Sequence, residues 1–271
     1  MNELFVNAAL KEAWNDEDLF QVIDRLEGEV FRTVKTRKTF RIEIANKGYF
    51  VKRHHGVGWA EIIKNIFQFK KPVLGAQNEF AALNLLNANN IPTMTCAAYG
   101  CKGINPAKLE SFLVTEELVD MISLEDLVKE PQKYHFNPKM RNKLITTLGW
   151  TVGSMHRLGL NHRDCYICHF LFKLDDLDKL YVIDLHRAQI REKIPYRYQV
   201  KDTAGIYFSS MDLKLNIKDI IRFVRAYSQK SFKLEMKENQ KFWQDVAIAA
   251  KKLYKKEFKC EAPLIISLQD K

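Results

Sequence analysis

The sequence predicts an α+β fold in which a β-rich N-terminal part is followed by a mainly helical C-terminal part. Between residues 28 and 54, apolar and charged side chains alternate, which is typical of half-buried strands. Residues 138–159 and most of 202–258 carry apolar side chains at helical spacing instead. Because the chain shows no internal repeat, these two patterns indicate two different structural parts.

The β-rich part begins with a hairpin. Phe40, Ile42 and Ile44 alternate with charged residues, Asn46-Lys47-Gly48 is a turn signal, and Tyr49-Phe-Val-Lys52 is the returning strand. Two amphipathic helices and two further strands follow, and they are predicted over 59–69, 77–88, 96–102 and 111–117. We expect this N-terminal lobe to span residues 1–118.

The helical part, a C-terminal lobe predicted over 119–271, is interrupted once. A long helix, a short loop and two apolar runs follow one another at 138–159, 160–169, 170–174 and 180–184. The acidic segment Asp175-Asp-Leu-Asp178 separates the two runs, which predicts a β-hairpin. The remainder of the lobe is predicted to be helical, with Lys-rich faces.

The charge of the chain predicts an anionic partner. Its 271 residues include 43 Lys and Arg against 33 Asp and Glu, which gives a formal net charge of +10. The positive charge is concentrated in two stretches. Residues 31–55 include eight basic residues and one acidic residue, and residues 187–201 include five basic residues and one acidic residue. We expect no nucleic-acid partner, because the sequence has no aromatic–basic platform, zinc finger or helix-turn-helix signature.

The cysteines pose a question that the sequence leaves open. Cys165-Tyr-Ile-Cys168-His169 has the spacing of a c-type haem attachment site, and with Cys96 and Cys101 it has the residues of a zinc site. The N-terminus has no secretory signal, and haem attachment of this type follows export. Two buried or half-buried free thiols are the alternative that we favour. No window is long and apolar enough for a membrane span, so we expect a cytoplasmic protein.

Three ionisable residues lie where strands end or loops begin. Lys52 is on a strand after a hairpin, Asp164 follows the long helix, and Asp184 ends an apolar strand. Taken singly, each is accounted for by solvation or capping. Together they fit phosphoryl transfer, which needs a cation for the nucleotide phosphates, a carboxylate for Mg²⁺ and a second carboxylate near the attacking hydroxyl. His162-Arg-Asp164 followed by a hairpin that ends in Asp is the layout of a protein-kinase-like fold.

The sequence resembles the lipopolysaccharide core heptose(I) kinases of Gram-negative bacteria. The resemblance covers about residues 25–227, and its most distinctive string is Asn161-His-Arg-Asp-Cys-Tyr-Ile-Cys-His-Phe-Leu. The other segments that carry it are Gly28-Glu-Val-Phe-Arg, Tyr49-Phe-Val-Lys, Glu61-Ile-Ile-Lys-Asn, Pro72-Val-Leu-Gly-Ala, Ser123-Leu-Glu-Asp, Val182-Ile-Asp-Leu-His-Arg-Ala-Gln and Tyr207-Phe-Ser-Ser-Met. It implies a two-lobed protein-kinase-like fold.

The resemblance implies a role for each catalytic candidate. Asp164 matches the catalytic aspartate, which accepts or orients the proton of the acceptor hydroxyl. Lys52 matches the lysine that holds the α- and β-phosphates, with Glu79 as the best candidate for its ion-pair partner and Glu61 as the rival. Asp184 matches the metal-binding aspartate.

Other positions match the kinase pattern less closely. His169 stands where protein kinases place a metal-binding asparagine, so we expect it to contact a metal or a phosphate, with a structural histidine as the alternative. Gly28 lies where a phosphate-covering loop is expected, although no GxGxxG is present. The segment that includes Glu116 and Leu118 fits the hinge that binds adenine. Asp202 could hold the catalytic loop or cap a helix.

The resemblance also implies substrates, cofactors and partners. The expected reaction is ATP- and Mg²⁺-dependent phosphorylation of the first heptose of the lipopolysaccharide inner core, with its 4-hydroxyl as the expected position. Alternatives are a kinase of this fold with another acceptor, such as another core sugar or a protein tyrosine, and a non-catalytic kinase-like binding module. The basic stretch 187–201 would recognise an anionic acceptor, or is a solvated surface. Acyl carrier protein, which is strongly acidic, is a candidate partner.

Membrane contact is a separate alternative. The segment 59–71 combines Trp59, Ile63, Ile66, Phe67 and Phe69 with lysines at 64, 70 and 71. It would either lie on the cytoplasmic face of the inner membrane or pack on the protein itself.

Overall fold

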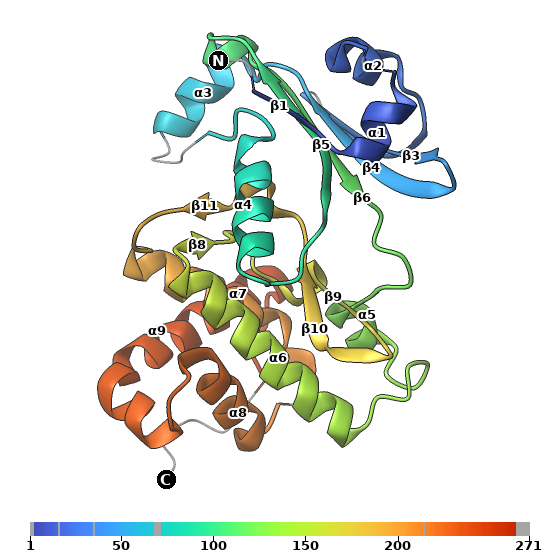
Figure 1. Cartoon of the computed structure of the whole chain (residues 1–271). Coiled ribbons are helices and arrows are strands. Elements are labelled where there is room, and N and C mark those ends of the chain that lie inside the picture. Colours follow the sequence, from blue (N-terminus) through green and yellow to red (C-terminus); the bar gives the residue numbers. More distant parts are fainter. Residues whose placement is uncertain (1–2, 16, 35, 68–71, 214, 264–271) are drawn as a thin grey trace. The chain divides into compact units, whose positions relative to one another are not determined.

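The computed structural model describes residues 3–15, 17–34, 36–67, 72–213 and 215–263 (Figure 1). The chain forms two compact units. Unit 1 comprises Met1–Asn87, Met94–Val119 and Leu185–Arg187, and unit 2 comprises Ala88–Thr93, Asp120–Asp184 and Ala188–Lys271. The sequence predicts a single division after residue 118. In the structure, the short segment 88–93 belongs to unit 2 and the short segment 185–187 belongs to unit 1, which the sequence does not predict.

Within the described residues, unit 1 is built on a six-stranded antiparallel sheet. The strand order is β1 (Glu3–Val6), β5 (Cys96–Lys102), β6 (Glu110–Glu116), β4 (Lys47–His54), β3 (Arg37–Ile44) and β2 (Glu29–Val34). The strands predicted over 28–54, 96–102 and 111–117 are therefore present. β1 was not predicted from the sequence, and it pairs with β5 from Glu3 opposite Cys101 to Val6 opposite Ala98.

The turn between β3 and β4 differs from the prediction. It consists of Ala45 and Asn46, with φ angles of 50° and 59°, and β4 already begins at Lys47. Two left-handed residues form the hairpin turn whose twist matches that of the flanking strands. The sequence places Gly48 in the turn, but in the structure Gly48 lies in β4 and pairs with Glu43.

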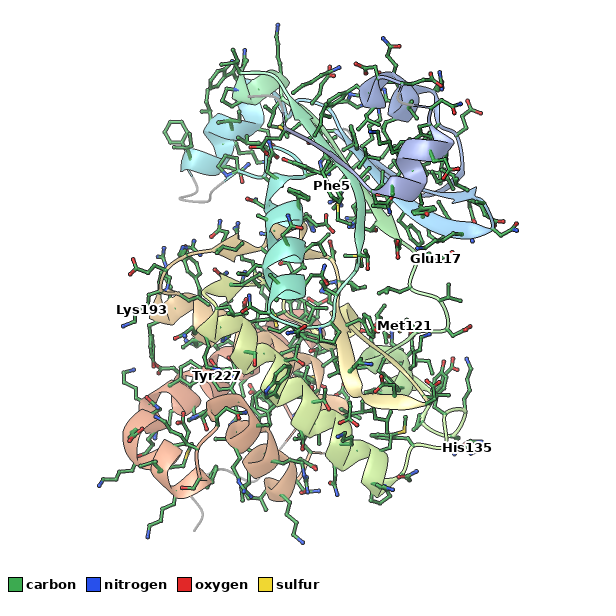
Figure 2. The ribbon with its side chains drawn as sticks, viewed as in Figure 1. Phe5, Glu117, Met121, His135, Lys193 and Tyr227 are labelled. Carbon is green, nitrogen blue, oxygen red and sulfur yellow. The ribbon has the colours of Figure 1, made fainter. Side chains whose placement is uncertain are left out.

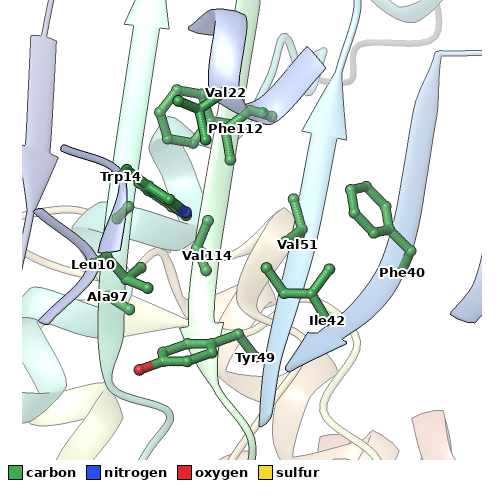
Figure 3. Packing of buried hydrophobic residues seen from close by; sticks show 12 residues of the cluster. Leu10, Trp14, Val22, Phe40, Ile42, Tyr49, Val51, Ala97, Phe112 and Val114 are labelled. Carbon is green, nitrogen blue, oxygen red and sulfur yellow. The ribbon is translucent and has the colours of Figure 1, made fainter. Parts of the chain in front are cut away.

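Four helices of unit 1 have described bounds: α1 (Ala8–Ala13), α2 (Leu19–Arg25), α3 (Gly58–Phe67) and α4 (Gln77–Ala88), with the 3₁₀ turn η1 at Pro106–Lys108. α1 and α2 were not predicted, and they cover one face of the sheet. Figure 3 shows Leu10 and Trp14 beside Ala97 and Val114, and Val22 beside Phe112. Burying these side chains is the main stabilisation of this face.

The small strands of unit 2 surround its central loop. β9 (Phe170–Lys173) lies between β10 (Asp176–Val182) and β7 (Ile122–Ser123), so the predicted hairpin is present. A second pair joins β8 (Leu160–Asn161) to β11 (Gln189–Ile190). The 3₁₀ turn η2 (Ile167–His169) leads into β9, whereas η3 (Leu185–Arg187) belongs to unit 1.

Helices make up most of the rest of unit 2. They are α5 (Leu124–Lys129), α6 (Pro138–Arg157), α7 (Tyr196–Ser209), α8 (Ile217–Ser228) and α9 (Phe232–Phe258), with the 3₁₀ turn η4 at Met211–Leu213. α6 packs on α8, and α7 packs on α9. The predicted helices at 138–159 and 202–258 are confirmed, whereas α5 was missed. No described helix has both the length and the apolar content that a membrane span requires.

Candidate active site

Unit 1 contains a buried ion pair between Lys52 and Glu79. Along β4, Val51 points into the core under α1 and α2, so Lys52 points to the opposite face of the sheet. There its Nζ lies 2.5 Å from Oε1 of Glu79 on α4. The Lys52 side chain is 14% exposed and that of Glu79 is 0% exposed. The structure therefore pairs Lys52 with Glu79, whereas the rival Glu61 contacts Lys64 and Asn65.

Gly28 directly precedes β2, the edge strand of the sheet. A Cβ atom at this position would overlap the carbonyl oxygen of Arg41, so the close approach to β3 requires glycine. β2 itself is exposed along its length, and Phe31 meets Phe50 edge to face. This packing accounts for Gly28 without any ligand, and its contact with phosphates stays a prediction.

The end of β6 is tied to the sheet on both sides. The N–H groups of Glu116 and Glu117 donate to the carbonyls of Thr95 and Gly48, each at 2.9 Å. The Glu117 carboxylate, at the end of β6 in Figure 2, accepts a 2.8 Å hydrogen bond from Arg41. In the part of the chain that the structure describes, Leu118 N–H has no backbone partner. A base could therefore meet this edge at Leu118 N–H and at the carbonyl of Glu116.

The catalytic candidate Asp164 of unit 2 lies in a loop that Asp202 holds. Asp202 is 1% exposed, and its two carboxylate oxygens accept hydrogen bonds from the backbone N–H groups of His162 (2.6 Å) and Arg163 (2.9 Å). Asp202 lies inside α7, whose N-cap is Pro195. The capping alternative is therefore wrong, and Asp202 holds the catalytic loop.

Two further residues on the same face of α7 contact this loop. Gly205 is one turn after Asp202, and a Cβ atom there would overlap the carbonyl oxygen of Cys165. Ser209 follows one turn later, and its hydroxyl accepts a 3.1 Å hydrogen bond from the N–H of Ile167. Sequence reasoning missed both residues, although the spacing of Asp202, Gly205 and Ser209 is that of one helix face.

His169 connects the backbone of Asp164 with the side chain of Asp184. Its Nδ1 lies 2.7 Å from the carbonyl oxygen of Asp164, and its Nε2 lies 3.6 Å from Oδ2 of Asp184. Because a carbonyl only accepts, Nδ1 carries a proton, and the other ring nitrogen, Nε2, faces the Asp184 carboxylate. All three predicted residues of unit 2 are thus brought together.

His162 stacks on His169 with ring centroids 5.4 Å apart. Its Nε2 donates to the carbonyl of Ile183 at 2.9 Å, which ties the catalytic loop to the segment that precedes Asp184. Burial lowers the pKa of His162, so this ring is neutral. His162 therefore shapes the site.

The backbone on either side of the site is held in an uncommon conformation. Arg163 and Asp184 have φ angles of 73° and 57°. Such residues persist where neighbouring contacts fix them, and they cluster at functional sites. Here the Asp202 carboxylate fixes the backbone of Arg163. Two residues before Asp184, the N–H of Val182 donates to the carbonyl of Pro92 (3.0 Å), and the carbonyl of Val182 accepts a hydrogen bond from the Thr93 hydroxyl (2.6 Å).

The Cys165–Cys168 motif is part of this loop. Cys165 is buried, and burial raises the pKa of its thiol well above the ordinary value. Burial also raises the pKa of Cys168 to about 11. Metal binding needs thiolates, so this environment disfavours it. Among the described residues there is no group of three or more His, Cys, Asp or Glu that could hold a metal.

Comparison with known proteins identifies the family. Residues 21–227 match the Lipopolysaccharide kinase (Kdo/WaaP) family. The chain belongs to this family. It is 40% identical to the lipopolysaccharide core heptose(I) kinase WaaP of Pseudomonas aeruginosa over 94% of this chain and 97% of that protein. It is 44% identical to the protein of the same name from Escherichia coli strain K12 over 80% of this chain and 84% of that protein.

A solved structure agrees with this family. WaaP in complex with acyl carrier protein matches with a TM-score of 0.79 and 36% identity, over 93% of this chain and 99% of that one. The predicted protein-kinase-like α+β fold is therefore confirmed. Because the family consists of kinases, the chain is an ATP-dependent phosphotransferase of lipopolysaccharide biosynthesis.

Proposed function

We propose that this kinase transfers the γ-phosphate of ATP to a hydroxyl of the first heptose of the lipopolysaccharide core, with the 4-hydroxyl as the expected position. The substrate is taken from the names of the relatives, and these relatives match the chain over most of its length. The observation that carries the proposal is the Asp164 loop, which Asp202 holds and His169 joins to Asp184.

The reaction joins the acceptor oxygen to phosphorus and breaks the bond between the γ-phosphorus and the bridging oxygen of ADP. Asp164 accepts or orients the hydroxyl proton, which leaves as the O–P bond forms. Lys52 contacts the α- and β-phosphates, and Glu79 fixes the direction of its ammonium group. A lysine held by one buried carboxylate has few alternative rotamers, so it is positioned before ATP binds.

The residues of unit 2 fit one Mg²⁺. Asp184 supplies a carboxylate oxygen, the donor that Mg²⁺ prefers, and its side chain is 29% exposed. Bound Mg²⁺ would neutralise charge on the phosphates. The Nε2 atom of His169 faces Asp184, but imidazole nitrogen is a poor ligand for this ion. We therefore assign the metal to Asp184, and assign His169 the role of orienting the Asp184 carboxylate or contacting a phosphate.

The test is transfer of labelled γ-phosphate to lipopolysaccharide that lacks core phosphate. We expect Asp164→Asn to lower kcat at least about a thousandfold with an unchanged melting temperature. Asp175→Asn, an exposed aspartate in the hairpin turn, is the matched control and should retain activity. Full activity of Asp164→Asn would contradict the assignment. Transfer only to another core sugar or to protein tyrosine would favour those acceptors, and ATP binding without any transfer would favour a binding module.

Acyl carrier protein is the partner that we propose, because a relative is solved in complex with it. Unit 2 contains a cavity of about 480 Å³ among α5–α9, lined by apolar side chains such as Leu127, Leu144, Ile206 and Val246. Ligand cavities commonly have about this size. The net charge of +10 favours a strongly acidic protein, and the cavity would take an acyl chain.

Binding of three forms of the carrier tests this partner. We expect the acylated carrier to bind at least about tenfold more tightly than the unacylated holo form. Equal affinity of the acylated and holo forms would contradict a role of the cavity. Failure of all forms, including the apo carrier, to bind would contradict the partner itself.

We also propose peripheral contact with the inner membrane through α3. Trp59, Ile63, Ile66 and Phe67 are exposed on this helix, and Phe67 is 80% exposed. An exposed apolar helix face of this kind can lie in a bilayer interface. Phe69, Lys70 and Lys71, which belong to the same predicted segment, lie outside the described residues.

Flotation with vesicles that contain anionic lipid tests the membrane proposal. Phe67→Ser should lower the bound fraction several-fold. Phe258→Ser, at an exposed aromatic residue of α9, is the control and should bind as the wild type does. Equal binding of the two variants would contradict a role of α3.

A further inference from the structure

Two guanidinium groups lie on one aromatic ring at the start of α7. The Cζ atom of Arg191 is 4.9 Å from the ring centroid of Tyr198, and that of Arg197 is 4.7 Å from it. Arg197 also donates a 2.8 Å hydrogen bond to the Tyr198 hydroxyl. We call these three residues the arginine clamp. All of them belong to unit 2.

The clamp is attached to the catalytic loop. Arg191 donates to Oδ1 of Asn161 at 2.5 Å, and it also donates to the side-chain oxygen of Gln189. Asn161 and Gln189 are buried and face each other in the β8–β11 pair. The backbone N–H of Arg191 donates a hydrogen bond to the carbonyl oxygen of Gly159 at 2.9 Å. Arg191 is therefore fixed next to a segment that reaches Asp164 only three residues after Asn161.

The charges of the clamp are not compensated by acidic side chains. Throughout the described residues, the side-chain partners of both guanidinium groups are neutral: two amides and a tyrosine. The only acidic residue between 187 and 201 is Glu192, which is exposed and forms no described ion pair. Asp245 on α9 instead contacts Tyr196 and Lys241. An oxyanion bound beside either guanidinium group would supply the negative charge that these side-chain partners lack.

We propose that the arginine clamp binds an oxyanion, a carboxylate or a phosphate, on the acceptor saccharide beside the sugar that is phosphorylated. Guanidinium groups suit this task because their planar N–H donors match the two oxygens of such groups. Position favours the acceptor over ATP, because the clamp adjoins the strand that leads into the Asp164 loop. The proposal rests on the proposed function and adds a specificity site to it.

Steady-state kinetics of the full chain with lipopolysaccharide lacking core phosphate tests the clamp. Arg197 is exposed, and within the described part of the chain no hydrogen bond or ion pair joins it to the catalytic loop, so Arg197→Gln is the informative variant. We expect it to raise KM for the acceptor about tenfold, while KM for ATP changes less than about twofold. Arg197→Lys should recover only part of the loss, since lysine lacks the planar donor pair.

Lys193 provides the matched control. It lies in the loop that leads into α7, is exposed and is labelled in Figure 2. Lys193→Gln removes the same charge, and we expect it to raise KM for the acceptor less than about twofold at physiological salt. An equal effect of the two variants would show a general surface charge and would overturn the clamp. An unchanged KM for the acceptor in Arg197→Gln would also overturn it.

Two chemically modified acceptors distinguish the source of the anion. One has its sugar carboxylates reduced to alcohols, and the other has its lipid phosphates removed. The modification that abolishes the difference between wild type and Arg197→Gln identifies the bound group, and persistence of the difference on both acceptors would refute the proposal. If wild type phosphorylates none of these acceptors, the proposed function fails; if wild type is active but Arg197→Gln is normal, only the clamp fails.

Discussion

Replacing Asp202 by asparagine should destabilise the chain and slow catalysis together. The carboxylate accepts hydrogen bonds from His162 N–H and Arg163 N–H, and it is almost completely buried. An asparagine side chain has one oxygen and one NH₂ group. It can therefore satisfy one of the two N–H groups, while its own donor faces the other.

The expected loss in the free energy of unfolding follows from these two hydrogen bonds. Each hydrogen bond to a buried charged acceptor contributes about 1.5–3 kcal/mol, and an unsatisfied buried donor costs about 1–3 kcal/mol. Since asparagine keeps one bond in neutral form, we expect the free energy of unfolding to fall by about 3 kcal/mol. Arg163 keeps its φ of 73° partly through this contact. Its loss should let the Asp164 loop relax and lower kcat by about a hundredfold.

Urea denaturation and initial rates on the same preparation measure both effects. Asp245→Asn is the control, because this aspartate pairs with Lys241 at the surface and its replacement should leave the urea midpoint close to that of wild type. If Asp202→Asn unfolds within about 0.5 kcal/mol of wild type, Asp202 does not hold the loop as we describe. Loss of stability with normal kcat would refute the link to catalysis.

Three further outcomes follow from the structure. Glu79→Gln should raise KM for ATP about tenfold, measured by initial rates, whereas Glu61→Gln should not, because only Glu79 is buried against the strand lysine. Ala45→Gly should raise the urea midpoint by an amount equivalent to about 0.5 kcal/mol, since alanine at φ 50° is strained. Burial lowers the pKa of His54 to about 3, so the unfolded chain takes up a proton at pH values near 6.5 and the folded chain does not. The free energy of unfolding should therefore fall by about 2 kcal/mol between pH 7 and pH 5, and His54→Asn should flatten this dependence; equal slopes in both proteins would contradict it.

Local patterns predicted the regular elements that bury a periodic face. α4 and the β3–β4 hairpin show such patterns in a few consecutive residues, as does α6. β1 is only four residues long, and its partner β5 begins about ninety residues later. α1 and α2 have six and seven residues, and helices this short depend on packing against the sheet. No local sequence pattern therefore predicts β1, α1 or α2.

In the candidate site, too, some residues could be predicted from the sequence and others could not. Lys52, Asp164 and Asp184 were found because their spacing and order fit one kind of chemistry. The choice between Glu79 and Glu61 required the direction in which α4 and α3 face, which the sequence does not give. Gly205 and Ser209 were missed because a glycine and a serine inside a helix are ordinary until the segment that they contact is known.

The exchange of two short segments between the units limits how the protein can be divided. A fragment that begins at Asp120 would lack Pro92 and Thr93, which bond to the backbone of Val182 two residues before Asp184. A fragment that ends at Val119 would lack residues 185–187, which belong to unit 1. We therefore expect neither fragment to fold alone, and we expect separately expressed fragments not to reconstitute activity.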